Sequence, residues 1–210
     1  MISYKRTVVW RTLGFIFLIC LVLSNCVYFR MTHLSNEDLE WINCHKRYPT
    51  SKFISNMGNT SKLNYTSVYI CNSTNPFYFN EGTSGKFEAN AGYDFEILQK
   101  DTVLRGTLLI FRYVGKDSLW VMYDLNNYMS NKYLYKGQPL ESNEFKMDSI
   151  VYHDCIIADS TNCIYTELWA KKIMNKIDKF VISKKYGLLY YRFQNGEEYK
   201  RQFKRKKKEE

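Results

Sequence analysis

The C-terminal end of the chain constrains the fold most strongly. Two runs that contain aromatic residues favouring strands, 188–194 and 197–203, flank Asn195-Gly196. Asn-Gly between two such runs is a strong hairpin signal, because both residues tolerate the positive φ of a tight type I′ turn. A third run, 179–183, precedes them across the turn-forming segment 184–187. This end is therefore predicted to form three antiparallel strands.

The composition extends this prediction to the rest of the chain. Aromatic residues make up 17% of the 210 residues, with 18 Tyr and 13 Phe against three Pro, and Tyr and Phe favour half-buried pleated surfaces. Further strands are predicted at residues 52–57, 65–71, 93–98, 106–113, 118–123 and 149–158. We therefore expect a mainly β fold, all-β or α+β, built as an antiparallel meander or half-barrel.

One helix is predicted before the first strand, over residues 34–42. Ser35 can cap it, acidic residues occupy its first turn, and Leu39 and Ile42 share a face. Residues 164–177 are ambiguous, since their apolar spacing approximates a helix while the neighbouring meander also accepts a strand. The polar, turn-rich residues 72–92 and 126–144 are predicted to be loops.

The N-terminus has the layout of an export signal. Three basic residues, Lys5, Arg6 and Arg11, precede an apolar run over residues 13–23, which is the arrangement of a secretory signal. The run holds eleven residues, whereas a helix needs about 20 to cross a bilayer. A single-pass membrane anchor is the alternative, and simple secretion is another.

The end of the apolar run separates these alternatives. Leu23-Ser24-Asn25-Cys26 matches the bacterial lipoprotein pattern, in which cleavage precedes a cysteine that then carries lipid; Asn25, larger than the usual residue, is the departure. The predicted organisation is a signal peptide (1–25), a tether (26–34), one antiparallel-β domain (35–203) and a charged tail (204–210). Cys26 is the predicted lipid-attachment residue, and a multiply acylated cysteine anchors stably.

The net charge of +9 does not indicate nucleic-acid binding. Three of the positive charges belong to the predicted signal, and residues 200–210 carry a net +5, which leaves about +1 for the body. A nucleic-acid surface needs basic residues spread over the folded domain. We therefore expect no nucleic-acid partner.

Four cysteines lie in the body of the chain: Cys44, Cys71, Cys155 and Cys163. An even number in an exported chain suggests disulfides. Three pairings exist, and the sequence-local one joins Cys44 to Cys71 and Cys155 to Cys163. Free buried thiols are the alternative, because cysteine packs well as a small apolar group.

Several segments together resemble a known family. Residues 148–157 (DSIVYHDCII) and 180–191 (FVISKKYGLLYY), with residues 34–42 and 53–59, resemble small exported β proteins of Bacteroidetes, many of them lipoproteins. The likeness covers roughly a third of the chain. It implies an exported β fold on the cell envelope and, because that family is largely uncharacterised, it implies no activity.

The sequence carries no catalytic signature. His153 and Cys155 are two residues apart on a predicted strand, so they are expected to share a face, and Cys44-His45 offers a second Cys/His pair. The paired close spacings of zinc sites are absent from the sequence, and so is G-x-S-x-G. We predict no metal, no cofactor and no assigned catalytic residue; an enzyme with unrecognised carboxylates is an alternative.

The function expected from the sequence is therefore a cell-envelope lipoprotein, a non-enzymatic binding or structural module held to the membrane by Cys26 and facing the periplasm or the exterior. Its partner is an unknown protein or an apolar small molecule. In the second case the protein is a carrier or sensor with a ligand cavity in the concave sheet. The aromatic residues that can line such a cavity are Phe77, Tyr78, Phe79, Tyr190, Tyr191, Phe193, Tyr199 and Phe203.

Overall fold

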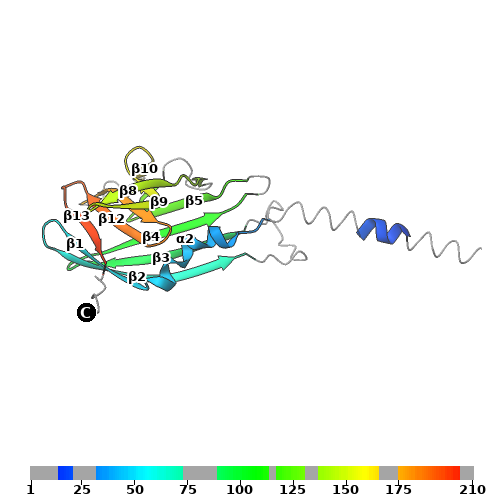
Figure 1. Ribbon diagram of the computed structural model, residues 1–210, viewed down its shortest axis with the longest axis horizontal. Coiled ribbons are helices and arrows are strands. Elements are labelled where there is room, and N and C mark those ends of the chain that lie inside the picture. Colours follow the sequence, from blue (N-terminus) through cyan, green and yellow to red (C-terminus); the bar gives the residue numbers. More distant parts are fainter. Residues whose placement is uncertain are drawn as a thin grey trace, which may run out of the picture.

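A thirteen-stranded antiparallel sheet curls into a half-barrel (Figure 1). The computed structural model describes residues 14–20, 32–72, 89–113, 117–130, 137–165 and 175–203. The strands are β1 (Thr50–Ser55), β2 (Thr60–Cys71), β3 (Asn90–Leu98), β4 (Val103–Phe111), β5 (Trp120–Leu125), β6 (Tyr128–Ser130), β7 (Gln138–Pro139), β8 (Asn143–Met147), β9 (Ile150–Ala158), β10 (Cys163–Tyr165), β11 (Ile177–Ser183), β12 (Gly187–Phe193) and β13 (Glu198–Gln202). The predicted antiparallel half-barrel is confirmed.

The two ends of the domain meet in the middle of the sheet. The strand order is β10-β6-β5-β4-β3-β2-β1-β13-β12-β11-β9-β8, and β7 pairs with β5 off this path. Strands β1 to β6 form a meander, and β11 to β13 form the predicted C-terminal hairpins, with Gly196 at φ 86° in the last turn. Strand β13 pairs with β1, so that Phe53 lies opposite Arg201.

Helix α2 (Asn36–Arg47) confirms the predicted N-terminal helix and runs five residues past its expected end. Ser35 accepts a hydrogen bond from the Asp38 amide while the Asp38 carboxylate accepts one from the Ser35 amide, which completes a capping box. Trp41 and Ile42 are buried, and the helix contacts β3 and β12 (Figure 1). Because those strands lie on opposite sides of β1, α2 spans the concave face.

An ion pair fixes the start of this helix to the sheet. Asp38 accepts hydrogen bonds from Arg112 Nε at 2.8 Å and Nη2 at 2.9 Å, a two-pronged geometry that favours arginine. Burial raises the pKa of Asp38, but the bonds from Arg112 and Ser35 outweigh it and hold the pKa below its ordinary value. The helix is thereby fixed to the sheet at the end of β4.

The concave face is filled by side chains. Its largest fully buried members are Trp41, Tyr93, Tyr191, Phe53, Phe95 and Phe180. Three of the aromatic residues predicted to line a ligand cavity, Tyr191, Phe193 and Tyr199, belong to this packed core. Tyr190 lies in a second cluster, Phe203 is exposed, and residues 77–79 lie outside the described residues.

The second cluster lies where the β8–β9 hairpin packs on β11 and β12. Strand β9 changes partner along its length: it pairs with β8 up to Cys155 and with β11 from Cys155 onward. Asp154 marks this change with a φ of 52°, and the hairpin packs Met147 and Tyr152 against Val181. Beyond this cluster, Asp148 at the hairpin turn pairs with Lys200 of β13 at 3.0 Å.

This bend corrects one prediction. His153 and Cys155 were expected to share a face, but His153 is exposed and Cys155 is fully buried. The irregular residue between them, Asp154, breaks the two-residue alternation of the strand.

The predicted loop over residues 126–144 is wrong in part. It contains β6, β7 and the start of β8, while residues 131–136 lie outside the described residues. The ends of the ambiguous segment 164–177 are strands, in β10 and β11, and residues 166–174 are not described. Residues 14–20 are helical and exposed. Among the described helices none is both long and apolar enough to span a bilayer.

Candidate functional site

The sheet leaves a seam between its two ends. On one side, β5 pairs with β7, with Val121 opposite Gln138. On the other side, residues 156–158 of β9 pair with β11, while β8 pairs with β9 only as far as Cys155. The turn at residues 159–162 then carries the chain from β9 to β10, which pairs with β6 at the opposite end. Side chains therefore fill this space in place of a further strand pair.

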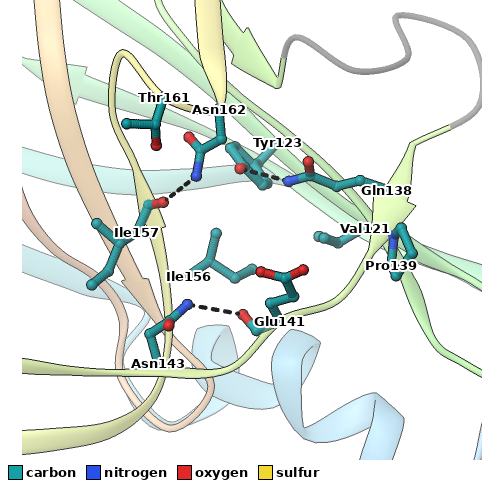
Figure 2. A pocket seen from close by; sticks show the side chains of 10 residues that line it. All are labelled: Val121, Tyr123, Gln138, Pro139, Glu141, Asn143, Ile156, Ile157, Thr161 and Asn162. Atoms are coloured by element: carbon teal, nitrogen blue, oxygen red, sulfur yellow. Dashed lines mark hydrogen bonds between the residues drawn. The ribbon is translucent and has the colours of Figure 1, made fainter.

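A pocket of about 140 Å³ opens in this seam (Figure 2). It is lined by Val121, Tyr123, Gln138, Pro139, Glu141, Asn143, Ile156, Ile157, Thr161 and Asn162. Ligand pockets for drug-sized molecules are about 300–1,000 Å³. The seam pocket is therefore sized for a small molecule or for one end of a larger one.

Part of the polar lining stabilises the pocket itself. Asn162 donates to the Ile157 carbonyl at 2.7 Å and accepts from the Asp159 amide at 3.0 Å. Its side chain thus satisfies a backbone carbonyl of β9 beyond the point where the pairing with β8 ends. Thr161 donates from its hydroxyl to Asp159 at 2.6 Å. The turn that borders the pocket is therefore held by its own hydrogen bonds.

The opposite wall is held by Tyr123 and Gln138. Gln138 Nε2 donates to the Tyr123 hydroxyl at 2.7 Å, a contact drawn in Figure 2. Burial, together with the nearby Cys163 thiol, raises the pKa of Tyr123. Tyr123 is therefore a neutral hydroxyl, and the amide oxygen of Gln138 accepts no hydrogen bond from the residues that the structure describes.

Glu141 is the one ionisable carboxylate of the lining. Its side chain is exposed and points into the pocket beside Ile156 (Figure 2). Within the described part of the chain it has no ion-pair partner and its carboxylate accepts no hydrogen bond. The lining thus combines an apolar floor, neutral amides and one free negative charge.

The candidate cysteines do not gather at this site. Cys163 adjoins it through Tyr123, and burial raises the pKa of its thiol to about 12. Burial also raises the pKa of the Cys155 thiol, to about 11, and that of Cys44. These three thiols are protonated and therefore weak nucleophiles. Cys26, the predicted lipid-attachment residue, lies outside the described residues.

All four body cysteines are free in the structure. Cys155 packs in the cluster under the β8–β9 hairpin, whereas Cys163 packs in the main core. Cys44 contacts the Tyr65 hydroxyl at 3.4 Å, and Cys71 lies six residues farther along β2, about 20 Å at 3.3 Å per residue. Cys44 and Cys71 are therefore not placed for bonding, which needs Cα atoms within about 7 Å, and Cys155 and Cys163 are free thiols in separate clusters.

The two Cys/His pairs form no metal site. His45 Nδ1 lies 2.7 Å from the Ile42 carbonyl, and His153 lies 2.9 Å from Glu144 on the surface. In the ranges that the structure describes, no group of three or more His, Cys, Asp or Glu side chains is placed to hold a metal ion.

Sequence reasoning missed the seam pocket. Gln138, Pro139, Glu141 and Asn143 were assigned to a loop, and the segment around them carries no motif that indicates a site. Comparisons with models of protein families, with curated proteins and with solved structures found no match to this chain.

Proposed function

We propose that this chain is a cell-envelope lipoprotein, held to a membrane through Cys26, whose β domain is a non-enzymatic binding module. The observation that carries the anchor is the order of the N-terminal features: basic residues, a short apolar run, and Leu23-Ser24-Asn25-Cys26. Thr32, six positions after Cys26, is held to the β domain by hydrogen bonds with the Arg112 carbonyl and the Ala89 amide, so a short tether suffices to join the domain to the lipid.

The binding role is supported by the seam pocket. Its lining offers one carboxylate, and acid–base hydrolysis of the glycosidase type uses two carboxylates facing one substrate. The buried thiols are protonated, as their raised pKa values indicate, so they do not supply a nucleophile either. A polar pocket without such a pair favours recognition over turnover.

An apolar cargo is less well supported. The concave face, where a lipid carrier needs its cavity, holds fully buried Trp41, Phe53 and Tyr93. These rings occupy the volume that an acyl chain needs. The proposal therefore places recognition at the seam and not inside the half-barrel.

Metabolic labelling tests the anchor. Cells expressing the full chain are grown with labelled palmitate, beside cells expressing Cys26→Ser and the control Cys20→Ser. We expect label in the parent chain and in the Cys20 variant, and no label in the Cys26 variant. Equal incorporation in the parent and the Cys26 variant contradicts the lipoprotein proposal.

A further inference from the structure

The seam pocket has a definite charge preference. None of its ten lining residues is Lys, Arg or His, and Glu141 supplies a carboxylate without a partner among the described residues. A carboxylate beside apolar surface attracts a cation and repels an anion, and the attraction exceeds that in bulk water. The ligand that fits this lining therefore carries positive charge.

The size and the apolar floor narrow the ligand further. About 140 Å³ is the space of roughly five water molecules, at about 30 Å³ each. Val121 and Ile156 are buried at the floor, with Pro139 beside them. Such a floor suits methylene groups and leaves the polar contacts to the rim.

The number of oxygen atoms that the pocket lining offers favours an organic cation over a metal ion. Calcium takes six to eight oxygen ligands, and this rim offers one carboxylate with the amides of Gln138 and Asn143. An ammonium group needs only three acceptors. The two Glu141 oxygens can supply two of them, and the amide oxygens of Gln138 and Asn143 belong to the same pocket lining.

We propose that the seam pocket binds a short primary alkylamine in its protonated form. The ammonium group pairs with Glu141, and the methylene groups lie on Val121 and Ile156. This inference rests on the proposed binding role of the domain and names the ligand class for the same site.

Ligand-observed NMR on the full chain in detergent tests this inference. The probes are n-pentylammonium, n-pentanol and pentanoate, which share a chain length and differ in the charge of the head group. We expect saturation transfer to n-pentylammonium, weaker transfer to n-pentanol and none to pentanoate. Equal transfer to all three, or no transfer to n-pentylammonium, overturns the inference.

Two matched variants test whether the Glu141 carboxylate is the group that binds the ammonium. Glu141→Gln keeps the shape of the side chain and removes its charge, and we expect n-pentylammonium to bind about tenfold more weakly, as for a lost charge-assisted hydrogen bond. Glu144→Gln changes a nearby carboxylate that faces His153 on the surface, and we expect unchanged binding. Unchanged binding by Glu141→Gln also overturns the inference, provided that its thermal unfolding matches the parent.

The labelling and binding experiments can fail separately. Label that depends on Cys26 with no amine binding leaves the anchor standing and removes the amine ligand. Amine binding to a chain that takes up no palmitate supports the ligand class and removes the lipid anchor.

Discussion

Polar side chains have different partners in two parts of the half-barrel: the wall, which is the continuously paired sheet from β5 through β1 and β13 to β9, and the seam where this pairing ends. In the wall, Tyr191 lies between Ser61 at 2.7 Å and Gln99 at 3.1 Å, so that its hydroxyl is used within the protein. In the seam, strand pairing stops and Glu141 faces a pocket without a partner among the described residues. The Tyr191 hydroxyl is thus used by the fold, whereas the Glu141 carboxylate has no such use among the described residues.

The comparison predicts that mutations in the packed wall lower the free energy of unfolding, whereas a mutation at Glu141 in the seam weakens ligand binding and leaves stability nearly unchanged. The largest effect is expected for Trp41→Ala, because this side chain on α2 is 2% exposed and fills the concave face. Truncating a buried Trp costs about 3–5 kcal/mol. Urea unfolding measures it, with Glu40→Ala on the exposed face of the same helix as the control. Equal midpoints for the two variants would contradict a packed interior.

The next largest effect on stability is expected at the ion pair between Asp38 of α2 and Arg112 at the end of β4. Arg112→Met removes the partner of Asp38, whose side chain is 8% exposed. Breaking a buried pair costs about 3–5 kcal/mol, and we expect about 2 kcal/mol here because Arg112 is partly exposed. The folded pKa of Asp38 is lowered, so its contribution is present above the unfolded pKa of about 3.9 and is lost as the pH falls through the folded value.

That loss can be measured as a difference between proteins. Urea unfolding of the parent should weaken between pH 5 and pH 3 by more than that of Arg112→Met. A parallel pH dependence in the two proteins would show that the pair does not stabilise the fold.

Asp124 lies on β5, the strand that also supplies Val121 and Tyr123 to the seam pocket, and its effect on stability tests the comparison of wall and seam. Burial raises its pKa to about 6, and its Oδ2 has no hydrogen-bond partner in the described part of the chain. The folded protein therefore holds this proton more tightly than the unfolded chain, whose pKa is about 3.9. The pH dependence of the free energy of unfolding therefore has the opposite sign to that from Asp38. The stability that Asp124 contributes is lost as the pH rises from about 4 through 6.

The substitution Asp124→Asn should remove this loss. We expect the variant to be more stable than the parent at pH 7 by on the order of 2 kcal/mol, and to match it near pH 4. Thermal unfolding at both pH values measures the difference. A gain of equal size at the two pH values would exclude titration of Asp124 as the cause.

The smallest effect on stability is expected at the seam itself. Glu141→Gln alters an exposed carboxylate without an ion-pair partner among the described residues, and such surface changes usually lie within about 0.5 kcal/mol. Its urea midpoint should match the parent while amine binding weakens. A large loss of stability would place Glu141 with the wall, as a structural residue.

The sequence predicted those elements whose signals are local. Ser35 caps the helix as the sequence predicted, and Asn195-Gly196 forms the last hairpin turn. The bend at Asp154 was not predicted, because most Asp residues have a negative φ even though Asp is enriched among the few residues with a positive one. For the same reason the sequence did not predict that His153 is exposed while Cys155 is buried.

The sequence by itself determined the antiparallel β class, the N-terminal helix and the hairpins, because alternation, caps and turn residues act over a few neighbours. It also supplies the anchor hypothesis at Cys26. Only the tertiary structure decided that β13 pairs with β1, that α2 fills the concave face, and that Val121, Glu141 and Ile156 surround one pocket. Those contacts join residues distant in sequence, and they depend on how the sheet curls and where its pairing ends.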